Sequence, residues 1–127
     1  MADDHDPLLE AVTTLVPALL TAMEALSRAG RHLHPPELAE LVAGVARCEP
    51  PLRQGLEAFE QAPWPDHLRD FRDAITAAST HALAAFEGLE ASLSRSNPVL
   101  GAYRALGRLT LAVEALYPVA FMLPPVN

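Results

Sequence analysis

The last quarter of the chain, residues 97–127, is too apolar to be an ordinary surface helix. As a helix, this segment would carry leucines and valines on more than one side. Such a helix needs several neighbouring helices to cover it. We therefore expect a helical bundle that leaves room for a partner. Between Pro98 and Asn127 the charged residues are Arg104, Arg108 and Glu114. The residues that repeat at steps of four and three, and so form one stripe on a helix, are Val99, Tyr103, Leu106, Thr110, Val113, Tyr117 and Ala120.

Length and composition predict a single helical domain. The chain has 127 residues, of which 50% are hydrophobic and 6% are aromatic. Runs of alanine and leucine favour helix, whereas the β-branched residues are too scattered to build strands. A domain of about this length buries roughly two-thirds of its unfolded surface, which is enough for a hydrophobic core. We expect one all-α domain over residues 1–127.

Capping residues divide the chain into four expected helices. Asp6-Pro7 and Asn97-Pro98 each combine an N-cap residue with a proline at the first helical position, where the missing N–H costs nothing. Asp66 is a third candidate cap. The expected helices span about residues 7–29, 36–61, 66–94 and 98–122.

Prolines and glycine predict irregularities within these helices. Pro17 removes one backbone hydrogen bond inside the first helix, so a bend is expected there, and Gly30 is expected to end the helix in a left-handed conformation. The second helix keeps its apolar spacing across Pro50-Pro51, which predicts a rod that is kinked or split at these prolines. Glu49 falls on the core-facing side of this rod, so it needs a partner or exposure to water.

Four amphipathic segments with short connections predict an antiparallel up-down-up-down four-helix bundle. The first and last helices are neighbours in this arrangement. Their low charge leaves a shared outer surface that is typical of an interaction site. The residues that we expect to be buried are Leu15, Leu19, Val42, Phe71, Ile75 and Leu106.

Charge and cysteine content restrict the partners and the compartment. A formal net charge of −7 without a cluster of basic residues disfavours nucleic acid and anionic membranes. The acidic N-terminus differs from a signal peptide, and no uninterrupted run of about 18 apolar residues is present to span a bilayer. Cys48 is the single cysteine, which is compatible with a reducing compartment. We expect a cytoplasmic protein that does not bind membranes.

His32 and His34 are the candidate metal ligands, with Glu37 close by. A His-x-His pair needs a further ligand at a defined geometry, and the Glu-x-x-His motif of di-iron bundles is absent. We prefer to interpret the pair as solvated loop residues, and we expect no metal and no cofactor. Phosphate loops, nucleophile elbows and Cys-x-x-Cys pairs are absent as well, which argues against an enzyme.

His81 is the candidate phosphoacceptor because it lies midway along the third expected helix. In this respect the chain is similar to phosphotransfer helical bundles, in which a histidine on a helix accepts a phosphoryl group. In those domains a basic residue and a glycine closely follow the histidine. Here Ala84 and Ala85 stand where a cation would stabilise the phosphoryl charge. A histidine at the edge of the core is the simpler interpretation.

The C-terminal residues resemble the end of a helical segment that precedes some bacterial phospholipase/carboxylesterase-type α/β-hydrolase domains. The resemblance rests on Tyr103-Arg104-Ala105-Leu106, Glu114-Ala115-Leu116-Tyr117-Pro118 and Leu123-Pro124-Pro125-Val126-Asn127, together with His32-Leu33-His34-Pro35-Pro36 and Trp64-Pro65. It covers the helical part only, so no catalytic residue carries over. It implies an accessory or regulatory module, with a hydrolase among the partners to test.

We therefore expect a non-enzymatic interaction or accessory module that self-associates or docks to a partner domain through its first and last helices. Residues 119–123 form an apolar run between two prolines that limit its continuation as helix, so part of the run should leave the bundle. The expected contact residues are Tyr117, Phe121, Met122 and Leu123.

Two alternative functions remain open at this point. One is a phosphotransfer protein that acts through His81. The other is a carrier of a small apolar ligand in the bundle interior, where many alanines leave room near Phe59, Phe71 and Phe86.

Overall fold

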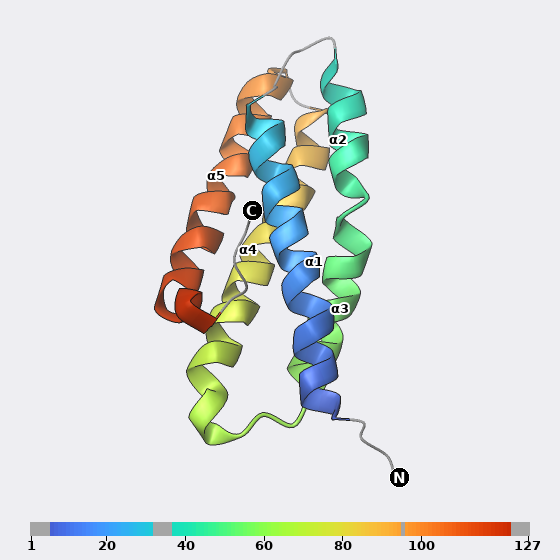
Figure 1. The fold of residues 1–127 in the computed structure, drawn as a ribbon. Coiled ribbons are helices and arrows are strands. Elements are labelled where there is room, and N and C mark those ends of the chain that lie inside the picture. Colours follow the sequence, from blue (N-terminus) through green and yellow to red (C-terminus); the bar gives the residue numbers. More distant parts are fainter. Residues whose placement is uncertain (1–5, 32–36, 95, 123–127) are drawn as a thin grey trace.

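The computed structural model describes residues 6–31, 37–94 and 96–122, and every regular element in these ranges is helical. Neighbouring rods alternate in direction: α2 and α3 together return beside α1, and α5 returns beside α4 (Figure 1). The expected all-α four-helix arrangement is confirmed. The elements are α1 (Pro7–Gly30), α2 (Leu38–Ala46), α3 (Glu49–Gln61), the 3₁₀ turn η2 (Asp66–Leu68), α4 (Arg69–Ser92), α5 (Pro98–Leu116) and the 3₁₀ turn η3 (Tyr117–Met122).

Asp6 caps α1 as predicted. Its carboxylate accepts hydrogen bonds from the backbone N–H of Leu8 at 3.0 Å and of Leu9 at 3.3 Å. The helix continues through Pro17 without a chain reversal. The prediction of a left-handed glycine at the end was wrong, because Gly30 is still helical and Arg31 closes the helix in the right-handed conformation.

Asp6→Ala should lower the free energy of unfolding by about 1 kcal/mol, because two N–H groups of the first turn lose their acceptor. Asp6→Asn is the matched control, since its amide oxygen still caps the helix. Urea titration followed by circular dichroism measures both variants. An equal loss in the two would show that the negative charge at the helix N-terminus matters more than the cap.

The second rod is split, and the break precedes the proline pair. α2 ends at Ala46, and α3 begins at Glu49 after a turn at residues 47–48, so Pro50 and Pro51 lie in the first turn of α3. Their missing N–H groups cost nothing there. The predicted position of the break was therefore wrong by a few residues. The apolar side continues across the break and buries Leu38, Val42, Val45, Leu52, Leu56 and Phe59.

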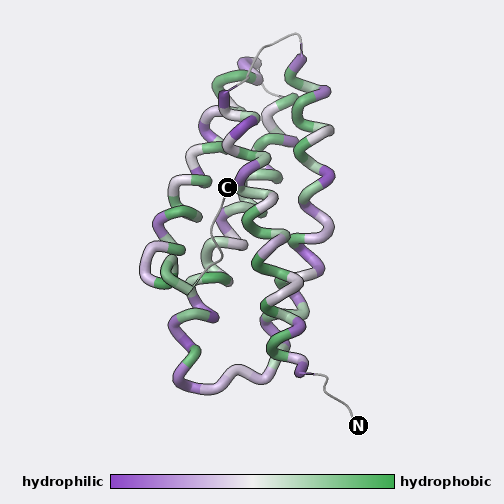
Figure 2. The backbone as a smooth tube through the Cα atoms, in the orientation of Figure 1, coloured by the Kyte–Doolittle hydropathy of each residue, from purple (hydrophilic) through white to green (hydrophobic). Residues whose placement is uncertain are grey.

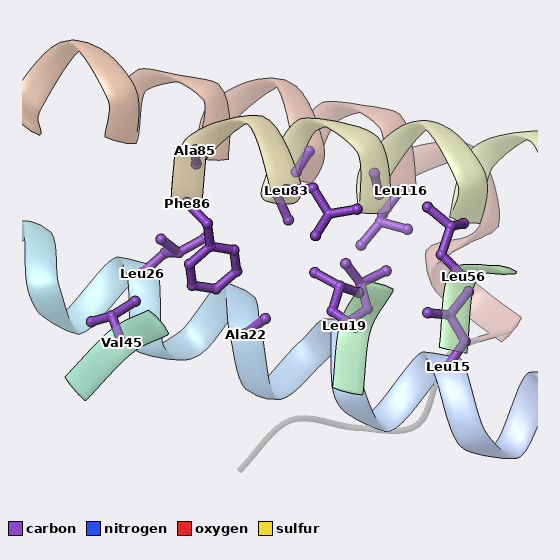
Figure 3. Packing of buried hydrophobic residues seen from close by; sticks show 14 of the residues in the cluster. Leu15, Leu19, Ala22, Leu26, Val45, Leu56, Leu83, Ala85, Phe86 and Leu116 are labelled. Carbon is purple, nitrogen blue, oxygen red and sulfur yellow. The ribbon is translucent and has the colours of Figure 1, made fainter. Parts of the chain in front are cut away.

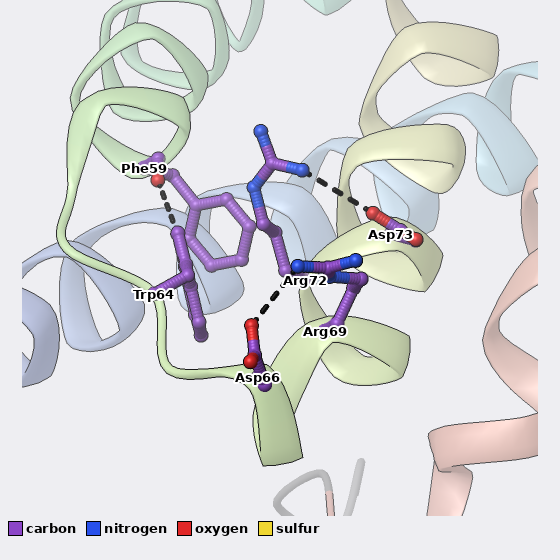
Figure 4. Close-up of polar contacts among 6 residues, drawn as sticks. All are labelled: Phe59, Trp64, Asp66, Arg69, Arg72 and Asp73. Carbon is purple, nitrogen blue, oxygen red and sulfur yellow. Dashed lines mark hydrogen bonds and ion pairs between the residues drawn. The ribbon is translucent and has the colours of Figure 1, made fainter.

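An aromatic corner joins α3 to α4 (Figure 4). The Trp64 Nε1–H donates to the Phe59 carbonyl oxygen at 2.7 Å, and the two ring centroids lie 4.6 Å apart. Trp64 thereby closes one end of the core. The predicted helix cap at Asp66 was wrong: Asp66 begins η2, its carboxylate pairs with Arg69 at 3.0 Å, and α4 begins at Arg69.

α5 begins at Pro98, and the Asn97 side chain accepts a hydrogen bond from the Leu100 N–H at 3.2 Å, as predicted. The expected helix to residue 122 was too long, because α5 ends at Leu116 and η3 follows. Pro118 gives the reason, since it cannot donate the hydrogen bond that would continue the α-helix.

The core runs the length of the bundle, and the six residues predicted to be buried all belong to it. Leu15, Leu19 and Ile75 are fully buried, and the other three are at most 9% exposed. Figure 3 shows side chains of α1, α2, α3, α4 and α5 meeting there, among them Leu15, Leu19, Ala22, Leu26, Val45, Leu56, Leu83, Phe86 and Leu116.

Candidate functional site

Large apolar side chains are exposed along α5 and η3. Tyr103 is 56% exposed, Tyr117 68% and Phe121 85%, while Val113 and Met122 are exposed to a smaller extent. Tyr103 and Val113 lie on one side of α5 by their spacing, and Tyr117, the first residue of η3, continues that side. Phe121 and Met122 follow in η3, which Figure 2 colours from pale to green because none of its residues is charged. We call these five residues the α5 apolar surface.

Three of the four predicted contact residues belong to this surface, namely Tyr117, Phe121 and Met122. The fourth, Leu123, lies outside the described residues. α1 contributes less than expected: Leu9 is its one large exposed apolar side chain. The candidate surface therefore lies mainly on the last helix and not, as expected, on the first and last helices together.

The predicted stripe on α5 is not its buried side. Of its seven members Leu106 is buried, whereas Tyr103, Thr110, Val113, Tyr117 and Ala120 are exposed. The residues that α5 buries are Ala102, Ala105, Leu106, Ala112 and Leu116.

A close contact between α4 and α5 explains which side of α5 is buried. A Cβ atom added to Gly88 would lie 2.7 Å from the Cβ atom of Ala105, so the helix contact admits only small residues at this point. α5 turns its alanines toward α4, and its tyrosines consequently face outward. Val119, 4% exposed, anchors η3 in the core, while Phe121 in the same turn is exposed.

His81 lies in the middle of α4 and is partly exposed. By helical spacing it shares a side of α4 with Ala84 and Gly88. Within the described part of the chain no hydrogen bond to His81 is found. The phosphoacceptor role of His81 stays a prediction.

The candidate metal ligands His32 and His34 lie outside the described residues. Among residues 6–31, 37–94 and 96–122, no group of three or more His, Cys, Asp or Glu side chains is placed to hold a metal ion. The thiol of Cys48 is partly exposed and unpaired.

The three phenylalanines of the carrier hypothesis are buried in the core. The rings of Phe59 and Phe71 lie 6.5 Å apart, and the Trp64 ring lies 6.1 Å from Phe71. Aromatic rings thus occupy part of the space near Phe59 in which a ligand was expected. The carrier function stays a prediction.

Glu49, which the sequence placed toward the core, is held by an arginine. Arg53 contacts the Glu49 carboxylate at 2.6 Å and the Glu87 carboxylate of α4 at 3.3 Å. The hydrogen bond to Glu49, and to a smaller extent the one to Glu87, raises the pKa of Arg53 above its ordinary value. The contact to Glu87 joins α3 to α4 on the outside of the bundle.

A groove of about 470 Å³ runs along the junction of α4 and α5, on the side of α5 that carries its two arginines. The groove was not predicted from the sequence, because a groove between helices depends on how they pair. The one sequence feature that could have indicated the groove is the spacing of Arg104 and Arg108, which lie one helical turn apart. The lining residues are Ala84, Gly88, Ser96, Asn97, Leu100, Gly101, Arg104, Ala105 and Arg108.

Two segments reach the length and apolar composition of a membrane span, Pro7–Gly30 and Pro98–Met122. The core helices of a helical bundle can have the same length and apolar composition. Both segments contribute residues to the core described above. Comparisons with family models, curated proteins and solved structures returned no match.

Proposed function

We propose that this chain is a non-enzymatic interaction module that self-associates through the α5 apolar surface. The observation that carries the proposal is the exposure of three aromatic side chains on one helix and its terminal turn, 56% for Tyr103, 68% for Tyr117 and 85% for Phe121. Exposed apolar groups that gather in this way are typical of protein contacts.

The size of the surface is compatible with a small dimer interface. Aromatic side chains bury about 150–250 Å² each, so the exposed parts of these three offer roughly 300–500 Å². Val113 and Met122 add to this area. A standard interface buries about 800 Å² on each partner, so flanking residues would supply the remainder.

The order of residues along α5 favours a second copy as the occupant. Tyr103 lies seven residues before Thr110 and Tyr117 seven residues after it, while Gly107 and Val113 lie three before and three after. An antiparallel copy centred on Thr110 therefore sets each Tyr103 against the partner subunit's Tyr117, and each Val113 against the partner subunit's Gly107. Gly107 has open space at its Cβ position. A two-fold interface needs this kind of self-complementarity.

Phe121→Asp should convert the protein from a dimer to a monomer, because it places a charge at the most exposed apolar position of the surface. Sedimentation equilibrium of both proteins over a range of concentrations measures the change. At concentrations low enough for the wild type to be monomeric, the two proteins should unfold at nearly the same temperature, since Phe121 makes little contact with its own bundle.

Ala43→Asp is the matched control, because it adds the same charge at an exposed position on α2 and should leave the dimer intact. A wild type that stays monomeric at high concentration would contradict self-association. Native mass spectrometry of the purified protein then shows whether another protein or an apolar ligand is bound instead.

A further inference from the structure

The groove between α4 and α5 carries positive charge on a protein that is otherwise acidic. Arg104 and Arg108 line it, and the formal net charge of the chain is −7. Neither arginine has an ion pair among the described residues, whereas Arg28, Arg53, Arg69 and Arg72 each pair with a carboxylate. Like charges one turn apart on a helix repel each other and cost a few tenths of a kcal/mol. An anion between them would remove that cost.

The floor of the groove allows a ligand to come close to the backbone. Ala84 and Gly88 of α4 and Gly101 and Ala105 of α5 line it, and none has a side chain beyond Cβ. The volume of about 470 Å³ lies within the roughly 300–1,000 Å³ of small-molecule sites.

The start of α5 adds polar groups to one end of the same groove. Ser96 and Asn97 line it there, and the first turn of α5 contains no acidic residue. A helix N-terminus carries a partial positive charge that favours anions. The arginines lie further along the helix, about 6 Å apart along its axis at 1.5 Å per residue. Positive charge thus extends along the groove rather than sitting at one point.

We infer that this groove binds a small molecule with two or more anionic groups, phosphates or carboxylates, held by Arg104 and Arg108. All nine basic residues of the chain are arginines, and the guanidinium group forms paired hydrogen bonds with both kinds of oxyanion. A long polyanion such as nucleic acid is disfavoured, because the rest of the surface is acidic and Glu87 and Glu90 lie on the same helix as the groove floor. The groove lies on a different side of α5 from Tyr103 and Tyr117, so the inference is independent of self-association.

Calorimetric titration at low ionic strength with inorganic pyrophosphate, and separately with citrate, tests the inference. We expect saturable binding of at least one of them with a Kd below about 1 mM. The Arg104→Gln/Arg108→Gln variant should bind about tenfold more weakly or worse, because it loses two charged donors. Tighter binding of pyrophosphate would assign the site to phosphates, and tighter binding of citrate would assign it to carboxylates.

Arg31→Gln/Arg47→Gln is the charge-matched control. Both residues are exposed and without an ion pair among the described residues, and this variant should bind within about twofold of the wild type. Amide NMR shifts on titration should concentrate at Ala84, Gly88, Ser96 and Gly101. The inference is wrong if neither anion binds, if the groove variant binds as well as the wild type, or if the control variant loses as much affinity as the groove variant.

Discussion

Leu19→Ala should lower the free energy of unfolding by about 2–5 kcal/mol. Leu19 is fully buried in the middle of α1 and belongs to the core that extends through all the helices (Figure 3). Truncation loses the free energy gained by burying the side chain, and it leaves a cavity that α1 and the three other helical rods cannot easily fill. Urea or thermal unfolding measures the loss.

Leu9→Ala provides the control for this substitution. The chemical change is identical and the residue lies on the same helix, but Leu9 is 60% exposed. Its truncation should change the free energy of unfolding by no more than about 0.5 kcal/mol. If Leu19→Ala also cost less than about 0.5 kcal/mol, the buried side of α1 would be wrongly assigned.

Features that depend on a few neighbouring residues could be predicted from the sequence. Asp6 and Asn97 cap their helices because an N-cap needs only a side-chain oxygen and the next turn. Leu15 and Leu19 of α1 and Phe71 and Ile75 of α4 were predicted to be buried as well, since apolar residues repeat at helical spacing there.

The break in the second rod lies before the proline pair and not at it. Glu49-Pro50-Pro51 was interpreted as an interruption within a helix. An acidic residue followed by prolines is also a favourable first turn, and the structure uses it in that way.

The buried side of α5 could not be predicted by spacing alone. This helix is apolar on several sides, so several stripes fit the helical repeat equally well. The short distance between α4 and α5 determines which side is buried. That distance depends on Gly88 and Ala105, which lie 17 residues apart in sequence. The α5 apolar surface and the arginine groove both follow from this pairing. Tyr117 and Phe121 were predicted as contact residues from the apolar sequence around Pro118, whereas the groove was not predicted.

Gly88→Ala should lower the free energy of unfolding by about 1–3 kcal/mol, although alanine is the better helix former by about 1 kcal/mol. The new methyl group would lie 2.7 Å from the Ala105 Cβ atom and 3.4 Å from its Cα atom. A methyl group has no flexible end that can move aside, so α4 and α5 must separate. Denaturant titration with circular dichroism detection gives the change.

Gly44→Ala and a compensating double variant make this test specific. Gly44 lies in α2 with open space at its Cβ position, so the same substitution there should raise stability by about 0.5–1 kcal/mol. Adding Ala105→Gly to Gly88→Ala restores the space between the helices, because one methyl group is removed where another was added. The two substitutions should therefore show a coupling of about 1 kcal/mol or more. If Gly88→Ala stabilised the protein as Gly44→Ala does, the close approach of α4 and α5 would be wrong, and with it the reason that the tyrosines of α5 face outward.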